Sequence, residues 1–221
     1  KNILHMFLAS KNKTFLRRYR FVRADIRNFK KINRIVRRFK PDYIVNCAAE
    51  SHNSLAIVKP RIFFQTNVLG TQNLLEAARK NNVRRFHHIS TCEVYGDLAL
   101  DSQETFSEDS PYKPNTPYNA SKAAADMAVR AYAKTFGLLI TISNCANNYG
   151  PYQFPEKLIP LSVTNILESK KMTLYNTSQN KREWIHVYDH CRGIYLFLNN
   201  GRVGETYNVG SGVERSIEEI A

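Results

Sequence analysis

The residues best suited to chemistry lie in two short segments, Ser90–Gly96 (STCEVYG) and Tyr118–Lys122 (YNASK). Tyr118 and Lys122 are four residues apart in a pattern typical of a helix start, so both lie on one helical face. A nearby ammonium favours a phenolate, which would let Tyr118 act as a base close to neutral pH. Chance pairs of this kind are common on solvated helices, so the spacing alone is weak evidence.

The first segment strengthens that interpretation. Ser90 and Thr91 follow an apolar run with the character of a buried strand, and Cys92 and Glu93 come directly after them. In a parallel sheet, a hydroxyl at the carboxyl end of a strand and a tyrosine on the following helix reach the same crevice. Such a pair is suited to removing a proton from a secondary alcohol while a hydride leaves to a nicotinamide.

Elements that would position these residues alternate along the chain. We expect strands at 20–25, 42–48, 84–90 and 138–144, and helices at 28–40, 63–80 and 119–137, with Gly137 as a helix stop. A turn-rich loop is expected at 97–117. This order predicts an α/β fold, a Rossmann-like doubly wound, mostly parallel sheet with helices on both faces.

The texture of the chain changes near residue 150, where proline, glycine and aromatic residues become frequent. We therefore expect an NAD-binding Rossmann-like domain at 1–150 and a smaller α/β substrate-binding lobe at 151–221, with segments around 183–200 returning to the sheet. Short segments such as KMTLY, REWIHVYDH and GETYNVG would build this lobe.

Composition excludes several classes of protein. No apolar run is long enough to span a membrane, and the four cysteines have neither metal-ligand nor redox spacing, which favours a cytoplasmic location. The net charge of +13 lies entirely in residues 1–40, which carry fourteen Lys or Arg and one acid. We interpret that excess as a solvated helix face rather than a nucleic-acid site, because no nucleic-acid motif accompanies it. Histidine spacing predicts no metal site, and His87 and His88 fit core or sheet-edge roles.

The motifs together resemble the extended short-chain dehydrogenase/reductase family, with the nucleotide-diphosphate-glucose 4,6-dehydratases as the closest branch. The resemblance runs through AAESH, TNVLGTQNLLEAAR, EVYGD, PYNASKAAAD, NNYGPYQFPEKLIP, REWIHVYDH and GETYNVGSG. The Tyr-x-x-x-Lys element identifies only the superfamily, whereas NNYGPYQFPEKLIP together with EVYG points to the dehydratase branch.

The resemblance implies a reaction and a role for each catalytic residue. Tyr118 would deprotonate the sugar C4 hydroxyl as NAD takes the C4 hydride, with Lys122 lowering the tyrosine pKa and Thr91 bonding the same hydroxyl. Glu93 would remove the C5 proton, a neighbouring acid would protonate the departing C6 hydroxyl, and the hydride would return to C6. The product would be a 4-keto-6-deoxy sugar.

Binding residues carry over in the same way. The cofactor-binding set would be Asp25, Ile26, Ala48, Ala49, Ser90, Tyr118, Lys122 and Asn144. The nucleotide-diphosphate-hexose substrate would be held by Asn147, Lys157, Leu158, Tyr175 and Arg182, although each of these also suits an ordinary helix face or a surface ion pair. The resemblance further implies a homodimer formed through the Tyr118 helix and the helix before it.

Two departures from the family pattern leave alternatives open. Cys92 stands where the family usually has an acidic aspartate. Four interpretations are open: the thiol is a slower acid, a bound water is the acid instead, the protein is a decarboxylase or C4 epimerase, or Cys92 is a small buried residue without a role. No glycine precedes Gly70, so the Gly-rich loop that binds a pyrophosphate is missing. We therefore expect a chain that is incomplete at both ends and binds NAD poorly as it stands. A non-catalytic binding relative is the remaining alternative.

Overall fold

The computed structural model describes residues 19–171 and 179–220. Its centre is a four-stranded parallel sheet in the order β1-β2-β3-β6, with bounds Tyr43–Asn46, Arg85–Thr91, Ile140–Cys145 and Thr206–Val209. The register aligns Asn46 with His88 and Ser90 with Asn144, so the carboxyl ends of the strands meet at one edge. Nearly every residue of β2 and β3 is buried, as expected of central parallel strands.

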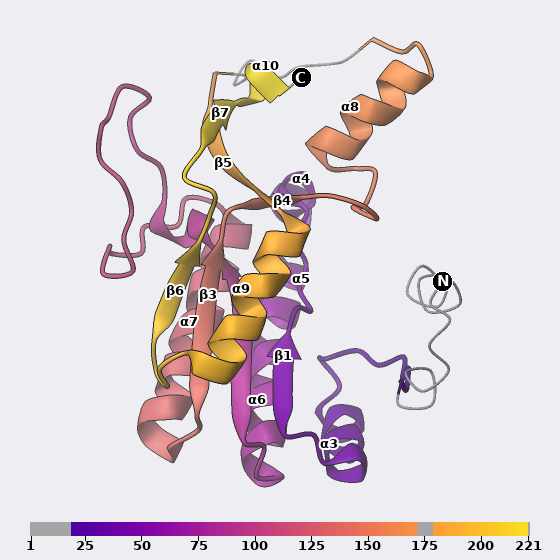
Figure 1. Ribbon diagram of the computed structural model, residues 1–221. Helices are drawn as coiled ribbons and strands as arrows, with labels where there is room; N and C mark the ends of the chain where they lie inside the picture. The colour runs from indigo at the N-terminus through magenta and orange to yellow at the C-terminus, as the bar shows by residue number, and fades with distance from the viewer. Residues whose placement is uncertain (1–18, 172–178, 221) are drawn as a thin grey trace.

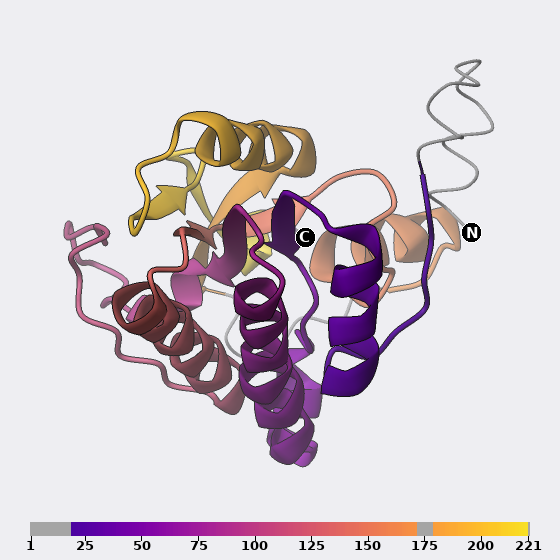
Figure 2. The same ribbon diagram turned by 90° about the horizontal axis from the view of Figure 1, so that it is seen from below.

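Helices cover both faces of this sheet (Figures 1 and 2). On one face lie α3 (Phe29–Phe39), the continuous helical run α5–η1–α6 (Pro60–Phe63, Phe64–Gly70 and Thr71–Lys80), and α7 (Pro117–Phe136). On the other face lies α9 (Val187–Asn200). The fold is therefore the predicted Rossmann-like α/β arrangement.

Helix α7, which carries Tyr118 and Lys122, has clear start and stop signals. The Thr116 side chain accepts a hydrogen bond from the Asn119 backbone N–H, and Pro117 occupies the first turn. The helix ends at Gly137, which has φ 67° and donates its N–H to the Ala133 carbonyl. The predicted helix stop is confirmed, and the caps fix the position of Tyr118 in the first turn.

A second layer of structure lies beyond the carboxyl ends of the main strands (Figure 1). A three-stranded sheet in the order β4-β5-β7 is formed by Asn147–Tyr149, Lys181–His186 and Glu214–Ser216. The short helices α4 (Asn53–Val58), η2 (Cys92–Tyr95) and α10 (Ile217–Ile220) and the longer α8 (Leu158–Leu167) complete the described part. The division into two domains near residue 150 stays a prediction.

The predicted strand at 20–25 is wrong. Residues 19–25 adopt no regular secondary structure, and Phe21 and Val22 are 75% and 43% exposed. The apolar residues that suggested a strand therefore lie on the surface. A strand also needs a neighbouring strand for its backbone hydrogen bonds, and none of the strands in the described ranges pairs with residues 20–25.

The main core lies between the four-stranded sheet and the face covered by α3, α6 and α7. Its fully buried members include Leu75, Phe86, Val129, Ile140 and Ile142, from α6, β2, α7 and β3. His87 and His88 are buried in β2, which confirms their predicted core location. Within the ranges described, no helix has both the length and the apolar character needed to cross a bilayer.

Candidate active site

The Ser90–Gly96 segment turns sharply where β2 ends. Thr91 is the last residue of β2 and the N-cap of η2, and its Oγ1 accepts a 3.3 Å hydrogen bond from the Glu93 backbone N–H. This cap folds Cys92 and Glu93 into a single 3₁₀ turn at the carboxyl edge of the sheet. The strand-then-turn arrangement explains why a hydroxyl, a thiol and a carboxyl group are crowded together here.

Tyr118 meets this turn from the first helical turn of α7. Its phenol is hydrogen-bonded to Thr91, and its ring contacts Phe63 edge-on with centroids 6.3 Å apart. Burial raises the pKa of Tyr118 well above its usual value, the Glu93 carboxylate raises that pKa further, and the bond with Thr91 lowers it. The predicted convergence of Thr91, Glu93 and Tyr118 is therefore present in the structure.

Lys122 lies one turn further along α7 and points into the interior. Its Nζ donates a 2.7 Å hydrogen bond to the Ile89 carbonyl and lies 3.4 Å from His88 Nε2. Burial lowers the pKa of the Lys122 ammonium, and Asp126 opposes that effect. The depressed tyrosine pKa expected of this spacing is not what the structure has, because burial is the largest influence on the phenol and the Lys122 ammonium is turned toward the Ile89 carbonyl.

Glu93 links the candidate catalytic residues to the predicted substrate residues. Burial raises the pKa of its carboxyl group, whereas Arg182, Lys157 and a hydrogen bond with Asn53 lower it. Arg182 in β5 and Lys157 at the N-cap of α8 are therefore close enough to act on Glu93 electrostatically. A buried carboxyl with a raised pKa is a suitable acid or base near neutral pH.

Cys92 is held firmly in its thiol form. Burial raises its pKa to about 12, and the neighbouring Glu93 carboxylate is the second cause. A thiol with so high a pKa retains its proton at neutral pH but releases it reluctantly. It is a weaker acid than the aspartate that the related dehydratases are expected to carry at this position.

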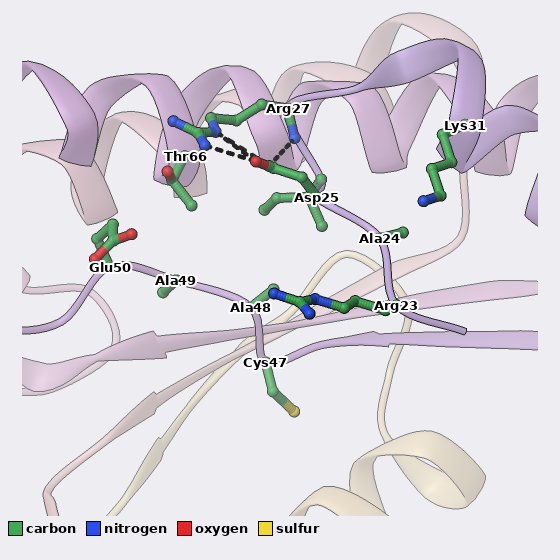
Figure 3. A pocket seen from close by; sticks show the side chains of 11 residues that line it. Arg23, Ala24, Asp25, Arg27, Lys31, Cys47, Ala48, Ala49, Glu50 and Thr66 are labelled. Atoms are coloured by element: carbon green, nitrogen blue, oxygen red, sulfur yellow. Dashed lines mark hydrogen bonds and ion pairs between the residues drawn. The ribbon is translucent and has the colours of Figure 1, made fainter. Parts of the chain in front are cut away.

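A cavity of about 780 Å³ brings together two of the predicted cofactor segments (Figure 3). Asp25, Ile26, Ala48 and Ala49 all line it. Figure 3 shows Asp25 across the cavity from Ala48 and Ala49, which follow β1. Asp25 is held by Arg27, whose Nη2 lies 2.6 Å from Asp25 Oδ2. This volume is in the range of small-molecule sites.

Ser90 and Asn144 face the interior rather than an open cavity. The Ser90 hydroxyl donates to Asp126 Oδ2 at 2.8 Å, and the Asn144 amide nitrogen lies 2.8 Å from the Tyr95 hydroxyl, to which it donates. Both residues are at most 3% exposed. Their side chains are engaged inside the fold, so their cofactor roles stay predictions.

The predicted substrate residues are spread over the second layer. Asn147 begins β4 opposite Trp184, and Leu158 begins α8 next to Lys157, whose Nζ donates to the Ser51 carbonyl at 2.8 Å. The Arg182 Nη1 donates to the Lys181 carbonyl at 2.9 Å. Tyr175 lies outside the described residues.

Three polar residues of the site were missed by sequence reasoning. Asn53 bonds Glu93 from α4, and His88 and Asp126 lie beside Lys122 in the interior. For Asp126 a signal exists, since it follows Lys122 by four residues on the same helix and therefore shares its face. For Asn53 and His88 the sequence offers no comparable signal.

The fold and the site define a class of protein. At the carboxyl edge of a parallel Rossmann-like sheet, where such folds bind ligands, lie the hydroxyl of Thr91, the partly buried carboxyl group of Glu93 and the phenol of Tyr118 from α7. The model of the NAD dependent epimerase/dehydratase family matches residues 5–210. The chain belongs to that family.

Curated relatives agree with this assignment. A dTDP-glucose 4,6-dehydratase from Neisseria meningitidis is 45% identical over 212 residues, which cover 92% of this chain and 59% of the relative. A dTDP-glucose 4,6-dehydratase from Mycobacterium tuberculosis is 48% identical over 196 residues, covering 89% of this chain and 58% of the relative. The chain thus spans about three fifths of the length of these relatives.

Solved structures give the same result for the fold. DesIV, a dTDP-glucose 4,6-dehydratase from Streptomyces venezuelae crystallised with NAD bound, superposes with a TM-score of 0.87 at 49% identity and covers 91% of this chain and 61% of its own. A UDP-glucose 4-epimerase from Thermus thermophilus in complex with NAD has a TM-score of 0.84 at 29% identity, covering 90% of this chain and 65% of its own.

Proposed function

We propose that the protein dehydrates a nucleotide-diphosphate-glucose to the 4-keto-6-deoxy sugar, as a lyase of the dTDP-glucose 4,6-dehydratase type. The observation that carries this proposal is the convergence of Tyr118, Thr91 and Glu93 at one sheet edge, with Arg182 and Lys157 acting on Glu93. The identity of 45% to the Neisseria enzyme, across both the sheet and the second layer, supports the same activity.

NAD is the proposed cofactor, and the residues present fit part of it. The lining of the cavity includes the small and apolar side chains of Ile26, Ala48 and Ala49. It also includes three basic side chains, those of Arg23, Arg27 and Lys31. An adenine ring suits the apolar walls, and phosphate oxygens suit the basic border. A bound NAD supplies the redox chemistry, as hydride acceptor for C4 and hydride donor for C6.

The chain's own residues handle the protons of this reaction. Tyr118 takes the proton of the C4 hydroxyl. Thr91, which is hydrogen-bonded to the phenol, lies beside it and orients the same hydroxyl. Burial raises the phenol pKa, so formation of the phenolate needs a positive charge nearby. Lys122, one helical turn along α7, would supply that charge. Glu93 removes the C5 proton once the 4-keto group acidifies it, and later returns a proton to C5.

Departure of the C6 hydroxyl requires an acid, and the Cys92 thiol stands at that position. The hydroxyl leaves as water after receiving the thiol proton. With a pKa of about 12 the thiol donates slowly, so we propose that elimination limits the rate of this enzyme. The same weak acid favours a second candidate function, a nucleotide-sugar decarboxylase or C4 epimerase, which needs no acid at C6.

We also propose a homodimer and a cytoplasmic location. Leu69 in η1 and Met127 in α7 are 57% and 49% exposed on the helices expected to pair with a second copy. All four cysteines are free thiols, which supports a reducing compartment.

The test is an incubation of the natural gene product carrying this chain with NAD and dTDP-glucose, followed by NMR of the sugar. We expect a 4-keto-6-deoxy product, and we expect Tyr118→Phe to lower its rate by about 10²- to 10⁴-fold. Tyr152→Phe, a change at a tyrosine that is 63% exposed, is the matched control. Conversion of UDP-glucuronate to a pentose, or of glucose to galactose stereochemistry without water loss, would instead support the second candidate.

A further inference from the structure

Beneath the candidate active site lies a buried cluster of four polar side chains, Asn46, His88, Lys122 and Asp126. They come from β1, β2 and α7 and are 2%, 1%, 4% and 0% exposed. Buried charged and polar groups persist only when they are paired. The partners within this buried cluster therefore reveal what each member does.

Asn46 fixes which nitrogen of His88 carries the proton. The Asn46 Oδ1 accepts a 3.1 Å hydrogen bond from the Ala48 backbone N–H, so its amide nitrogen is the other end of the side chain. That nitrogen donates to Thr71 Oγ1 at 3.1 Å and lies 3.2 Å from His88 Nδ1. Since an amide nitrogen can only donate, His88 Nδ1 accepts, and the ring proton sits on Nε2.

The Nε2 proton has one carboxylate oxygen within reach. His88 Nε2 lies 3.4 Å from Asp126 Oδ1, which is buried and makes no hydrogen bond in the structure. The other oxygen, Oδ2, accepts from the Ser90 hydroxyl at 2.8 Å and from the Tyr112 hydroxyl at 3.1 Å. Asp126 is thus held on one side and turned toward His88 on the other.

Lys122 faces the same imidazole. Its Nζ donates to the Ile89 carbonyl at 2.7 Å and lies 3.4 Å from His88 Nε2. Because an ammonium and an Nε2–H are both donors, the contact with His88 is not a hydrogen bond, and the Ile89 carbonyl is what holds Lys122. Three groups near Lys122 would favour its ammonium if they were ionised: Asp126 on the same helix, Cys145 on β3 and Cys47 after β1. Asp126 is the one carboxylate among them. Burial lowers the pKa of Lys122 and raises that of the Cys145 thiol to about 11, so Cys145 stays neutral and contributes no charge.

We propose that Asp126 is the buried counter-ion of Lys122 and that His88, neutral and protonated on Nε2, lies between the two and turns its N–H toward the free oxygen of Asp126. Both are positioning residues that act through Lys122. The buried cluster then carries one positive and one negative charge. Its catalytic consequence rests on the proposed function: without Asp126 the lysine loses its charge and no longer supports the phenolate of Tyr118.

The first test needs no variant. Long-range ¹H–¹⁵N spectra of the natural gene product, with histidine labelled and the His88 signals assigned by their loss in His88→Gln, report which ring nitrogen is protonated. We expect one tautomer, protonated on Nε2, that does not titrate between pH 5 and 8. A proton on Nδ1, or a His88 that becomes doubly protonated in this range, would overturn the proposal.

The second test follows the charge of Lys122. With [¹³Cε]-lysine, and the Lys122 signal assigned by its loss in Lys122→Arg, the titration midpoint of the ammonium is measured in wild type, Asp126→Asn and Asp126→Glu. We expect Asp126→Asn to lower the midpoint by about one to three pH units and Asp126→Glu to restore most of it. Asp189→Asn, on the exposed surface of α9, is the control and leaves the midpoint unchanged.

An unchanged midpoint in a folded Asp126→Asn protein would contradict the counter-ion role. Should Asp126→Asn not fold, the tautomer of His88 in the wild-type protein decides the matter. Neither measurement uses turnover, so a protein that gives the expected spectra yet forms no 4-keto product would refute the proposed function alone.

Discussion

At the scale of single residues, the site depends on how burial alters proton affinity. Cys92 and Glu93 lie in one turn, Tyr118 meets that turn from α7, and burial raises the pKa of all three side chains. For Glu93 this brings the carboxyl closer to the working range of a base, whereas for Cys92 it moves the thiol further from the range of an effective acid. In the proposed reaction, the same burial would help Glu93 to remove the C5 proton and would hinder Cys92 from protonating the departing C6 hydroxyl.

Replacement of Cys92 tests whether its thiol is a poor acid for water loss. Burial also raises the pKa of a carboxyl group, so Cys92→Asp should create an acid that holds its proton and yet gives it up more readily than the thiol. We expect the rate of water loss from the sugar to rise by about tenfold or more. The measurement is single-turnover kinetics of the 4-keto-6-deoxy product.

Cys92→Ser is the control for that change, since a hydroxyl keeps the size of the thiol but is a still weaker acid. No gain in Cys92→Asp, or a loss equal to that of Cys92→Ser, would mean that the acid at C6 is a water or that no elimination takes place.

Sequence reasoning succeeded at this scale where topology does the positioning. Thr91 and Tyr118 were expected to meet because a strand end and the start of the following helix share one edge of a parallel sheet, and they do. His88 and Asp126 were not anticipated, since their pairing depends on which side chains the packed interior turns toward each other. The depressed pKa expected for Tyr118 failed for the same reason, because burial is a property of the folded molecule.

At the scale of elements, the helical run from Pro60 to Lys80 packs closely against the lining of the cavity at Asp25–Ile26 through a single glycine. A Cβ at Gly70 would lie 2.6 Å from Ile26 Cδ1 and Cγ1, and Ile26 lines the cavity. The helix therefore lies so close to the Ile26 side chain that a Cβ at position 70 would force that side chain to move.

Gly70→Ala should lower the free energy of unfolding by about 1–3 kcal/mol, because the gain in helix propensity is outweighed by overpacking against Ile26. In the Ile26→Ala background the same change should cost less, since the clashing atoms are gone. Gly193→Ala is the matched control: its Cβ would meet nothing closer than 3.5 Å, so a stabilisation of up to about 1 kcal/mol is expected. Urea unfolding measures all three, and equal effects of Gly70→Ala in both backgrounds would contradict the contact.

Strands and helices were predictable to the extent that each carries its own pairing and capping signals. The strands β1, β2 and β3 follow from apolar runs, and the end of α7 follows from Gly137. Residues 20–25 have the same apolar and charged composition, but a strand is a property of two segments. Without a partner in the described part, Phe21 and Val22 remain on the surface.

At the scale of the whole molecule, the central sheet ties stability to pH through buried histidines. His87 is fully buried between Thr141 and Ser143, and burial lowers its pKa to about 4 from an ordinary value of 6.5. Between these values the unfolded chain binds a proton that the folded protein does not, so this residue's contribution to stability is lost as the pH falls from about 6.5 to 4.

His87→Gln removes that contribution and should lower the slope of the free energy of unfolding against pH in this window, by up to about 1.4 kcal/mol per pH unit. The comparison with wild type is needed because Asp126, whose pKa burial raises to about 6, contributes a slope of the opposite sign. Urea unfolding at several values between pH 4 and 7 is the measurement. Parallel curves for the two proteins would show that His87 does not titrate on unfolding.

Assembly is also a property of the whole molecule. If two copies pair through η1 and α7, a charge at Leu69 would be buried in the interface, so Leu69→Glu should convert the dimer to a monomer in sedimentation velocity. Leu167→Glu, at a leucine of α8 that is 81% exposed, should leave the dimer intact. A monomeric wild type, or a dimer unaffected by Leu69→Glu, would place the interface elsewhere or nowhere.

The most direct test of the proposed dehydration follows the hydrogen atom that starts at C4 of the sugar. dTDP-glucose carrying deuterium at C4 is incubated with NAD and the natural gene product, and the product is analysed by NMR and mass spectrometry. If Tyr118, Thr91 and Glu93 act on one hexose, the deuterium is recovered at C6 of a 4-keto-6-deoxy sugar. Deuterium that stays at C4, or a sugar that keeps its C6 hydroxyl, would contradict the account.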